Sequence, residues 1–229
     1  MTDYKLEAAK AALLLIKPGQ TIGLGAGTTV ANLVAMIRQK LELAPTLLFT
    51  SSSFKTTNLL LEYGLRVQSP ALLTHIDIYF DGCDQFDLEL NALKSGGGIH
   101  TTEKILASMA DEFILIGDET KFVEKLDTKY PLVVEILPQA LQIVLSRLTS
   151  DFPEAKITLR MSDKKDGAVI SENGNFLADI YFASAIRPEK LNVQIKMIPG
   201  IVDHSLFYRM ATKALIAGEN GVRVIMPEY

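Results

Sequence analysis

The chain of 229 residues has a single cysteine, Cys83, and lacks any long apolar run. One cysteine cannot form an internal disulfide, which fits a reducing compartment. The longest candidate for a targeting segment, KAALLLIKPG, holds only a few apolar residues between two lysines and is closed by Pro18 and Gly19. It is too short for a signal core or a membrane span, so we expect a cytoplasmic protein with no membrane partner.

Basic residues and metal ligands are also scarce. Lys and Arg number 23 against 27 Asp and Glu, which gives a formal net charge of −4. Without a basic surplus the chain offers no general attraction for a polyanion, so we expect no nucleic-acid partner. The three histidines, His75, His100 and His204, have no metal-ligand spacing between them, and we therefore expect no bound metal and no cofactor.

The chain does have enough apolar sequence, 48% of its residues, to bury one large core or two modest ones. In its first part, short β-branched runs alternate with amphipathic stretches: TIGLG precedes TTVANLVAMIRQK, TLLFT precedes SFKTTNLLLEYG, and DIYF precedes TTEKILASMA. Repeated βα units predict a mostly parallel sheet covered by helices, that is, an α/β protein with a Rossmann-like main domain.

The pattern changes after Pro131. PLVVEIL leads to a helix-like PQALQIVLSRL, then to KITLRM, GAVIS, an Asn-Gly turn in ENGN, FLADIYF and the helix-like RPEKLNVQIKMI. This order predicts a smaller, ferredoxin-like α+β domain over residues 131–200. Residues 1–130 with 201–229 then form the main domain, and the final GVRVIM is expected to return to its sheet.

Ligands bind at the carboxyl ends of strands in open parallel sheets, and polar loops follow each predicted strand here. In GLGAGTT, Gly25 and Gly27 free the backbone, and Thr28 with Thr29 opens a helix whose N–H groups suit an anion such as a phosphate. A tight turn without a ligand remains the alternative. Ser51 and Ser52 end the next strand, where plain N-capping competes with ligand binding.

Two acids, Asp81 and Asp84, follow the apolar strand DIYF, and Gly82 between them allows both side chains to point into one pocket. Solvated loop acids or an Asx turn would explain them equally simply. We place Asp87, further along the chain, at the surface.

The segment LKSGGGIHTTEK contains successive glycines, which lose much chain entropy on folding and pack poorly, so something should approach their backbone closely. Lys94 precedes Gly96 and Gly97, and Glu103 lies in the first turn of the next predicted helix, where it could simply favour the helix dipole. Lys121 after FILIGDE and Lys5 on the first helix could supply cations, although lysines are usually solvated surface residues.

Read in order, GLGAGTT, SSSFKTT, DIYFDGCDQFD, LKSGGGIHTTEK and IGDETK resemble the successive motifs of type A ribose-5-phosphate isomerases, and PLVVEILPQA, ENGN and IPGIVDHSLF extend the resemblance over nearly the whole chain. The resemblance implies a metal-independent aldose–ketose isomerase of the pentose phosphate pathway that interconverts ribose 5-phosphate and ribulose 5-phosphate. It also implies a homodimer or homotetramer and a sugar phosphate as partner.

The family's catalytic positions are occupied here by a glutamate base, two aspartates and a lysine, namely Glu103, Asp81, Asp84 and Lys94. By the same matching, the residues that contact substrate and phosphate are Gly25, Gly27, Thr28, Thr29, Ser51, Ser52, Gly96, Gly97, Lys121 and Lys5. Several positions depart from the usual pattern, among them Ala26, which loses a hydroxyl, Gln85, which loses a carboxylate, and Ser95, which replaces a glycine. None of these changes removes a proposed catalytic group.

Two other functions remain as alternatives to the isomerase. One is a non-catalytic sensor of the related superfamily that binds a sugar phosphate, although this chain has no helix-turn-helix extension. The other is acyl transfer to coenzyme A with a glutamate nucleophile, for which the extra domains usually needed are missing. Turnover of ribose 5-phosphate separates the isomerase from both.

Overall fold

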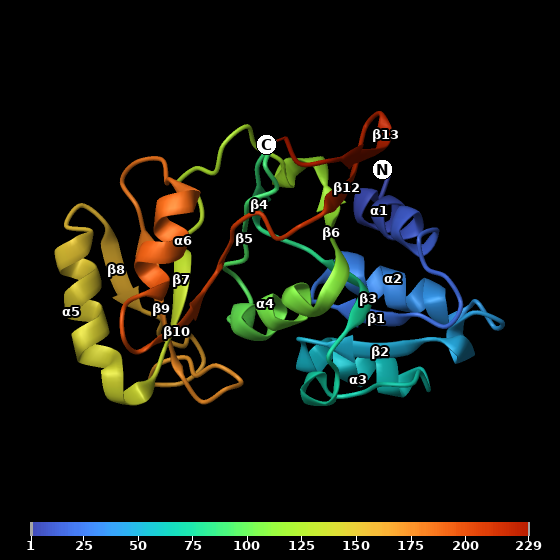
Figure 1. Ribbon diagram of the computed structural model, residues 1–229, viewed down its shortest axis with the longest axis horizontal. Coiled ribbons are helices and arrows are strands. Elements are labelled where there is room, and N and C mark those ends of the chain that lie inside the picture. Colours follow the sequence, from blue (N-terminus) through green and yellow to red (C-terminus); the bar gives the residue numbers. More distant parts are fainter. Residues whose placement is uncertain (1, 229) are drawn as a thin grey trace.

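The computed structural model describes residues 2–228 and is built around a six-stranded sheet (Figure 1). Its strands, in the order β13-β12-β6-β3-β1-β2, are Gly221–Ile225, Lys213–Gly218, Ala110–Asp118, Ile76–Asp81, Thr21–Leu24 and Leu48–Ser51. All neighbours pair in parallel except β13, which forms an antiparallel hairpin with β12. The predicted α/β class is confirmed, and GVRVIM does return to this sheet as β13.

The helices of this part are α1 (Tyr4–Leu13), α2 (Thr28–Arg38), α3 (Phe54–Glu62) and α4 (His100–Met109). In α2 the spacing of Val30, Leu33, Val34 and Ile37 gives one apolar face, and all four side chains are fully buried. Alternation along the strands sends Phe80 to the cluster under α1 and α2 and its neighbour Tyr79 to the opposite cluster, which α4 covers. The sheet is therefore buried on both faces.

A second, antiparallel sheet of four strands occupies the other half of the molecule (Figure 1). Its order is β10-β7-β9-β8, formed by Ile201–His204, Leu132–Ile136, Phe176–Tyr181 and Lys156–Leu159. The helices α5 (Leu141–Asp151) and α6 (Pro188–Lys196) pack on it and enclose a separate apolar core. The chain order β-α-β-β-α-β is the ferredoxin-like arrangement expected from the sequence. GAVIS, however, forms only isolated bridges at Ala168 and Ile170.

Between these halves lies a small sheet in the order β11-β5-β4, made of Leu206–Phe207, Ala92–Leu93 and Gln85–Phe86 (Figure 1). Short 3-10 turns occur at Ala44–Thr46, Pro70–Leu72, Glu119–Lys121 and Pro138–Ala140. No helix among residues 2–228 is long and apolar enough to cross a membrane.

The division into a main and a small domain stays a proposal, and the pairing of β10 bears on its boundary. Ile201 pairs with Ile136, and His204 pairs with Val134, so β10 completes the four-stranded sheet. A boundary at residue 200 separates this strand from its partner. We therefore propose that the small domain extends through His204, and we use the term small domain for residues 131–204.

Candidate active site

The carboxyl ends of β1, β3 and β6 lie at one edge of the main sheet, because these strands run parallel and are neighbours. The loops that follow them surround a cavity of about 340 Å³. Its lining residues come from the loops and helix starts at this edge: Lys5, Ala26, Gly27, Thr28, Thr29, Asp81, Gly82, Cys83, Asp84, Lys94, Gly96, Gly97, Glu103, Ile116, Gly117, Asp118 and Lys121. Most of the residues predicted from the sequence are thus brought together.

Lys94 lies between two carboxylates in this cavity. Its Nζ is 2.8 Å from Asp81 Oδ2 and 3.2 Å from Glu103 Oε1, and it also donates to the carbonyl oxygen of Gly82. The three side chains come from different elements, Asp81 from the end of β3, Lys94 from the residue after β5, and Glu103 from the first turn of α4. The fold therefore gathers one cation and two acids around a single point.

All three groups are largely removed from water, with Asp81 1% exposed, Lys94 7% and Glu103 5%. Burial, followed by the negative charge of Asp81, raises the pKa of Glu103 to about 8. Burial alone would lower the pKa of Lys94, but Asp81 and Glu103 outweigh it and raise that pKa, so the lysine stays charged. Glu103 is therefore a carboxylate with an unusually high proton affinity beside a permanent cation.

Asp81 is held in place by further hydrogen bonds. Its Oδ1 accepts from the backbone N–H groups of Gly82 at 2.8 Å and Ala26 at 3.2 Å, and its Oδ2 accepts from the hydroxyl of Tyr79. Burial and the nearby charge of Asp81 raise the pKa of Tyr79 well above its usual value, so the phenol remains a donor. Sequence analysis did not select Tyr79, although a residue two positions before Asp81 on one strand shares its face.

Asp84 performs a different task in the structure. Its Oδ2 accepts from the backbone N–H groups of Ser95 at 2.5 Å and Gly96 at 3.2 Å. The carboxylate thereby fixes the start of the glycine segment that borders the cavity. Asp84 is suited to positioning this loop and the lysine that precedes it.

Other residues that line the cavity have the features of an anion site. Helix α2 starts there with Thr28 and Thr29, and its N-cap Gly27 (φ 100°) has no side chain that could accept from the first N–H groups. Lys5 and Lys121 line the same cavity. Helix N-termini and lysines both favour a phosphate.

Gly25, Ser51 and Ser52 do not line the cavity, in contrast to the sequence-based expectation. A Cβ at Gly25 would lie 1.9 Å from the Asp81 carboxylate, so only a residue without a side chain leaves space for this acid. Ser51 Oγ accepts from the N–H of Ser53 at 3.0 Å, and Ser52 Oγ lies 3.4 Å from the Tyr79 hydroxyl. Both hydroxyls thus have partners inside the protein.

Several lining residues were absent from the predicted set, notably Asp118, Gly117 and Cys83. Asp118 ends β6, where its carboxylate accepts from Thr120 N–H at 3.1 Å and caps the turn that carries Lys121. Asp118 could have been selected from the sequence by the criterion used for Asp81, because it too is an acid at the end of a predicted strand.

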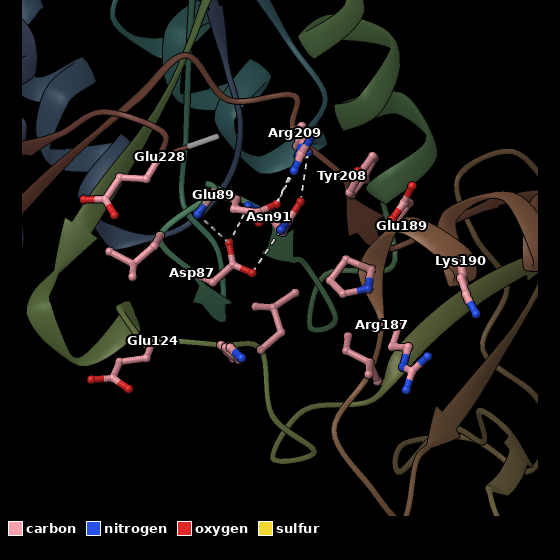
Figure 2. A pocket seen from close by; sticks show the side chains of 15 residues that line it. Asp87, Glu89, Asn91, Glu124, Arg187, Glu189, Lys190, Tyr208, Arg209 and Glu228 are labelled. Carbon is pink, nitrogen blue, oxygen red and sulfur yellow. Dashed lines mark hydrogen bonds and ion pairs between the residues drawn. The ribbon is translucent and has the colours of Figure 1, made fainter.

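A larger cavity, about 520 Å³, lies near residues 87–91 and the start of α6 (Figure 2). Asp87 was expected at the surface but is only 6% exposed, because it accepts from the Asn91 side chain at 3.0 Å and from two backbone N–H groups of its turn. Arg209 at this cavity pairs with Glu89 at 2.7 Å. We place the active site in the smaller cavity, since the buried lysine and carboxylates line that one.

One group of possible metal ligands occurs among the described residues, at the other end of the main sheet. Ligand atoms of His75, Asp77 and Asp111 lie within 4.8 Å of one another. Sequence spacing did not indicate this group because Asp111 lies on the neighbouring strand. His75 pairs with Asp111 at 2.9 Å and Asp77 accepts from Thr21 N–H at 2.7 Å, so hydrogen bonding accounts for the arrangement without an ion.

The chain is similar in sequence to the proteins of one family. The sequence model of "Ribose 5-phosphate isomerase A (phosphoriboisomerase A)" matches residues 48–221. Ribose-5-phosphate isomerase A of Prochlorococcus marinus is 34% identical over 225 residues, which cover 96% of this chain and 94% of that protein.

Solved structures agree with the sequence comparison. The ribose 5-phosphate isomerase A of Methanocaldococcus jannaschii superposes with a TM-score of 0.90 at 34% identity, covering 98% of both chains. A D-ribose-5-phosphate isomerase in complex with phospho-erythronic acid has a TM-score of 0.90 at 33% identity, with 97% of both chains covered. The chain therefore belongs to the ribose 5-phosphate isomerase A family.

Proposed function

We propose that this protein interconverts ribose 5-phosphate and ribulose 5-phosphate through an enediolate, with Glu103 as the base. The observation that carries the proposal is the position of Lys94 Nζ, 2.8 Å from Asp81 and 3.2 Å from Glu103 inside a cavity that also has an anion site. An aldose–ketose isomerisation needs a base, a group that transfers hydroxyl protons and a partner for a developing oxyanion. These three side chains supply them.

In this mechanism Glu103 removes the proton from C2 of the open-chain aldose. The C–H electron pair forms the C1–C2 double bond, and negative charge moves to O1, where Lys94 stabilises it. Asp81 takes the proton from the C2 hydroxyl and delivers it to O1, and Glu103 then returns its proton to C1. The product has a carbonyl at C2, and no proton or electron is gained or lost overall.

The raised pKa of Glu103, about 8, suits this role because a general base works best when its pKa is near the working pH. Thr28 and Thr29 with the α2 N-terminus, together with Lys5 and Lys121, would hold the phosphate. Gly96 and Gly97 line the cavity, and because the Gly96 N–H already donates to Asp84, the backbone N–H of Gly97 is the one suited to contacts with sugar oxygens.

The similar structure described as a complex with phospho-erythronic acid supports a phosphorylated sugar as the ligand. That compound joins a phosphate to a polyhydroxy chain that ends in a carboxylate. In this chain the matching features are the cationic end of the cavity and the Lys94 end, which could each receive one anionic group.

Proton exchange during turnover tests the proposal. In deuterated water, purified protein should convert ribose 5-phosphate to ribulose 5-phosphate and incorporate solvent deuterium at C1, because the enediolate is protonated there by an exchangeable base. Nuclear magnetic resonance measures both events. Binding without any turnover would support a sugar-phosphate sensor instead. Turnover without exchange would favour either hydride transfer or a base that returns the abstracted proton before it exchanges with water.

We also infer that catalysis needs no metal, because the base, the proton-transfer group and the oxyanion partner are all side chains. Activity should survive exhaustive treatment with a chelator, and restoration of a lost activity by a divalent ion would contradict this inference. The family resemblance further supports a homodimer or homotetramer that works in the cytoplasm in the pentose phosphate pathway. Light scattering should then give the mass of two or four chains.

A further inference from the structure

Glu135 is a fully buried glutamate on β7 of the small domain, 0% exposed, and the mechanism above does not use it. Its Oε1 accepts from Ser171 Oγ at 2.6 Å and from Asn175 Nδ2 at 2.8 Å, and Asn173 Nδ2 approaches the carboxylate at 3.1 Å. Its Oε2 accepts from the hydroxyl of Thr101. A buried carboxylate is costly to desolvate, so such a complete set of donors points to a function.

The donors keep this carboxylate charged. Burial acts to raise the pKa of Glu135, but the hydrogen bonds from Ser171, Thr101 and the two asparagines outweigh it and lower the pKa. The three donors from residues 171–175 belong to one tight turn of the small domain, in which Gly174 adopts φ 79°. Thr101 alone comes from the other half of the molecule.

Thr101 lies in the first turn of α4, two residues before Glu103. The bond to Glu135 therefore ties the start of the helix that carries the proposed base to the sheet of the small domain. A shift of this helix start would move the Glu103 carboxylate relative to Lys94 and Asp81.

A second link holds the other end of the same stretch. Arg160, next to β8, donates from Nη2 to the carbonyl oxygen of Ser95 at 2.8 Å and from Nη1 to that of Gly96 at 3.4 Å. Asp179 on β9 fixes the guanidinium by accepting from its Nε at 3.1 Å. Residues 95–101, the glycine segment, are thus held from the small domain at both ends.

We propose that Glu135 and Arg160 are positioning residues, which hold the glycine segment and the start of α4 so that Glu103 and the backbone of Gly96 and Gly97 face the substrate. This inference rests on the proposed isomerase function. It assigns the small domain a part in the chemistry, although none of residues 131–204 lines the catalytic cavity. The alternative is that Glu135 and Arg160 only hold the two halves of the molecule together and have no effect on the position of Glu103.

Thr101→Val tests the proposal most gently, because valine keeps the shape of threonine and removes only the donor to Glu135. Displacement of a catalytic group by about 1 Å can cost up to about 100-fold in rate, so we expect kcat to fall about 10- to 100-fold. KM should change less than about threefold, since the anion site is not touched. Thr101→Ser, which keeps the hydroxyl, should restore most of the rate.

Two controls separate positioning from stability. Thr102→Val changes the neighbouring threonine on the same turn, which is not among the donors to Glu135, and it should leave kcat within about twofold of the parent. Val144→Ala opens a cavity in the core of the small domain, where Val144 is 0% exposed, and should lower Tm without an equal loss of kcat. Glu135→Gln and Arg160→Met should resemble Thr101→Val in their kinetics wherever they fold.

A pH profile provides a readout that lost stability would not change. If α4 is loosened, Glu103 becomes more hydrated and moves away from Asp81, so its pKa falls from about 8 and the acid limb of kcat/KM shifts to lower pH. Asp81, Lys94, Tyr79, Cys83 and Asp84 are charged or titratable groups in or beside this cavity, and none of them is altered in Thr101→Val.

The outcomes are distinct. Reduced kcat with a shifted acid limb in Thr101→Val, reversed in Thr101→Ser, supports the proposal. An active parent protein with a fully active, unshifted Thr101→Val variant overturns the positioning role and leaves the isomerase function intact. A parent protein that does not convert ribose 5-phosphate overturns the isomerase function and this inference with it.

Discussion

At the scale of single residues, the cavity depends on one lysine shared by two acids. Lys94 has Asp81 and Glu103 within 3.2 Å, and the positive charge allows two buried carboxylates to exist side by side. The excess negative charge then falls on Glu103, whose pKa rises to about 8 because of burial and Asp81. A carboxylate in this state is a stronger base than an ordinary glutamate, which helps it to take a proton from carbon while Lys94 stabilises the oxyanion.

The pH dependence of activity follows from this pKa. The base must be ionised to accept the C2 proton, so kcat/KM for ribose 5-phosphate should rise with pH towards about 8 and then level off. Asp81→Asn removes a negative neighbour, which lowers the pKa of Glu103 and should move this acid limb to lower pH even though the rate falls. Initial rates at several pH values measure the acid limb. An acid limb that stays in place in Asp81→Asn would show that the pKa seen in the profile is not that of Glu103.

Gly25 gives a second test at this scale, because the position has space for hydrogen but not for a methyl group. In Gly25→Ala the new Cβ would lie 1.9 Å from Asp81, so the carboxylate must turn away from Lys94. We expect kcat to fall at least about tenfold, since displacing a reacting group by about 1 Å has effects of that size or larger. Circular dichroism should confirm an intact fold, and a fully active variant would show that Asp81 need not stay where it is.

At the scale of elements, the parallel strand β3 places Asp81 at the cavity, and the N-terminus of α2 supplies the N–H groups of the expected anion site. The ends of β1 and β3 are neighbours, so the loop after Leu24, which leads into α2, lies beside Asp81. The α2 N-terminus and Lys121, which follows β6, then face the same cavity as Glu103. We therefore expect one edge of the sheet to provide both the reactive groups and a phosphate-binding part, which we call the phosphate end.

The phosphate end predicts strong discrimination against unphosphorylated sugar. A charge-assisted hydrogen bond contributes about 1.5–3 kcal/mol, so Lys121→Ala should raise KM for ribose 5-phosphate by about tenfold or more with a smaller effect on kcat. Free ribose should be a very poor substrate for the parent protein. Steady-state kinetics with both sugars test this expectation, which equal turnover of ribose and ribose 5-phosphate would refute.

At the scale of the whole molecule, buried histidines join the two halves. His100 begins α4, and His204 ends β10, and burial together with the charge of Lys104 lowers the pKa of each to about 4. Lys104 Nζ also donates to the carbonyl oxygen of His204 at 2.7 Å and pairs with Asp203 at 2.6 Å. Protonating either histidine would place a second cation beside this lysine.

Stability should therefore depend on pH from both sides. The unfolded chain takes up protons on His100 and His204 at about pH 6.5, so the stability from these residues is present above that pH and is lost as the pH falls towards 4. Glu103 acts in the opposite sense, since its folded pKa is raised from 4.5 to about 8 and its contribution is lost as the pH rises between these values.

Urea unfolding at a series of pH values should consequently give a stability maximum on the acid side of neutrality. His100→Gln with His204→Gln should flatten the acid side, and Glu103→Gln should flatten the alkaline side. His75→Gln is the matched control for the acid side, because His75 is exposed, lies outside this junction and has a pKa that its hydrogen bond with Asp111 raises rather than lowers. A profile that is flat from pH 4 to 8 in the parent protein would mean that these groups do not titrate as their burial requires.

The sequence predicted those features that depend on local pattern and strand order. Repeated βα units predicted the parallel sheet, and the family resemblance, with motifs that follow the predicted strands, grouped Asp81, Lys94 and Glu103 in one site. The hydrogen bond from the N–H of Ser53 to Ser51 Oγ could not be predicted, because the sequence leaves both N-capping and ligand binding open for these serines. The contact of Glu135 with Thr101 was missed because it joins residues far apart in the chain that no local pattern connects.

The central claim is that Glu103 accepts the C2 proton, and Glu103→Gln tests it most directly. Glutamine keeps the size and much of the hydrogen bonding of glutamate but cannot act as the base. A general base contributes about 10²–10⁴-fold, so turnover of ribose 5-phosphate should fall at least about 100-fold while its Kd, from calorimetry, changes less than about tenfold. A Glu103→Gln protein that binds and turns over ribose 5-phosphate like the parent would contradict the account.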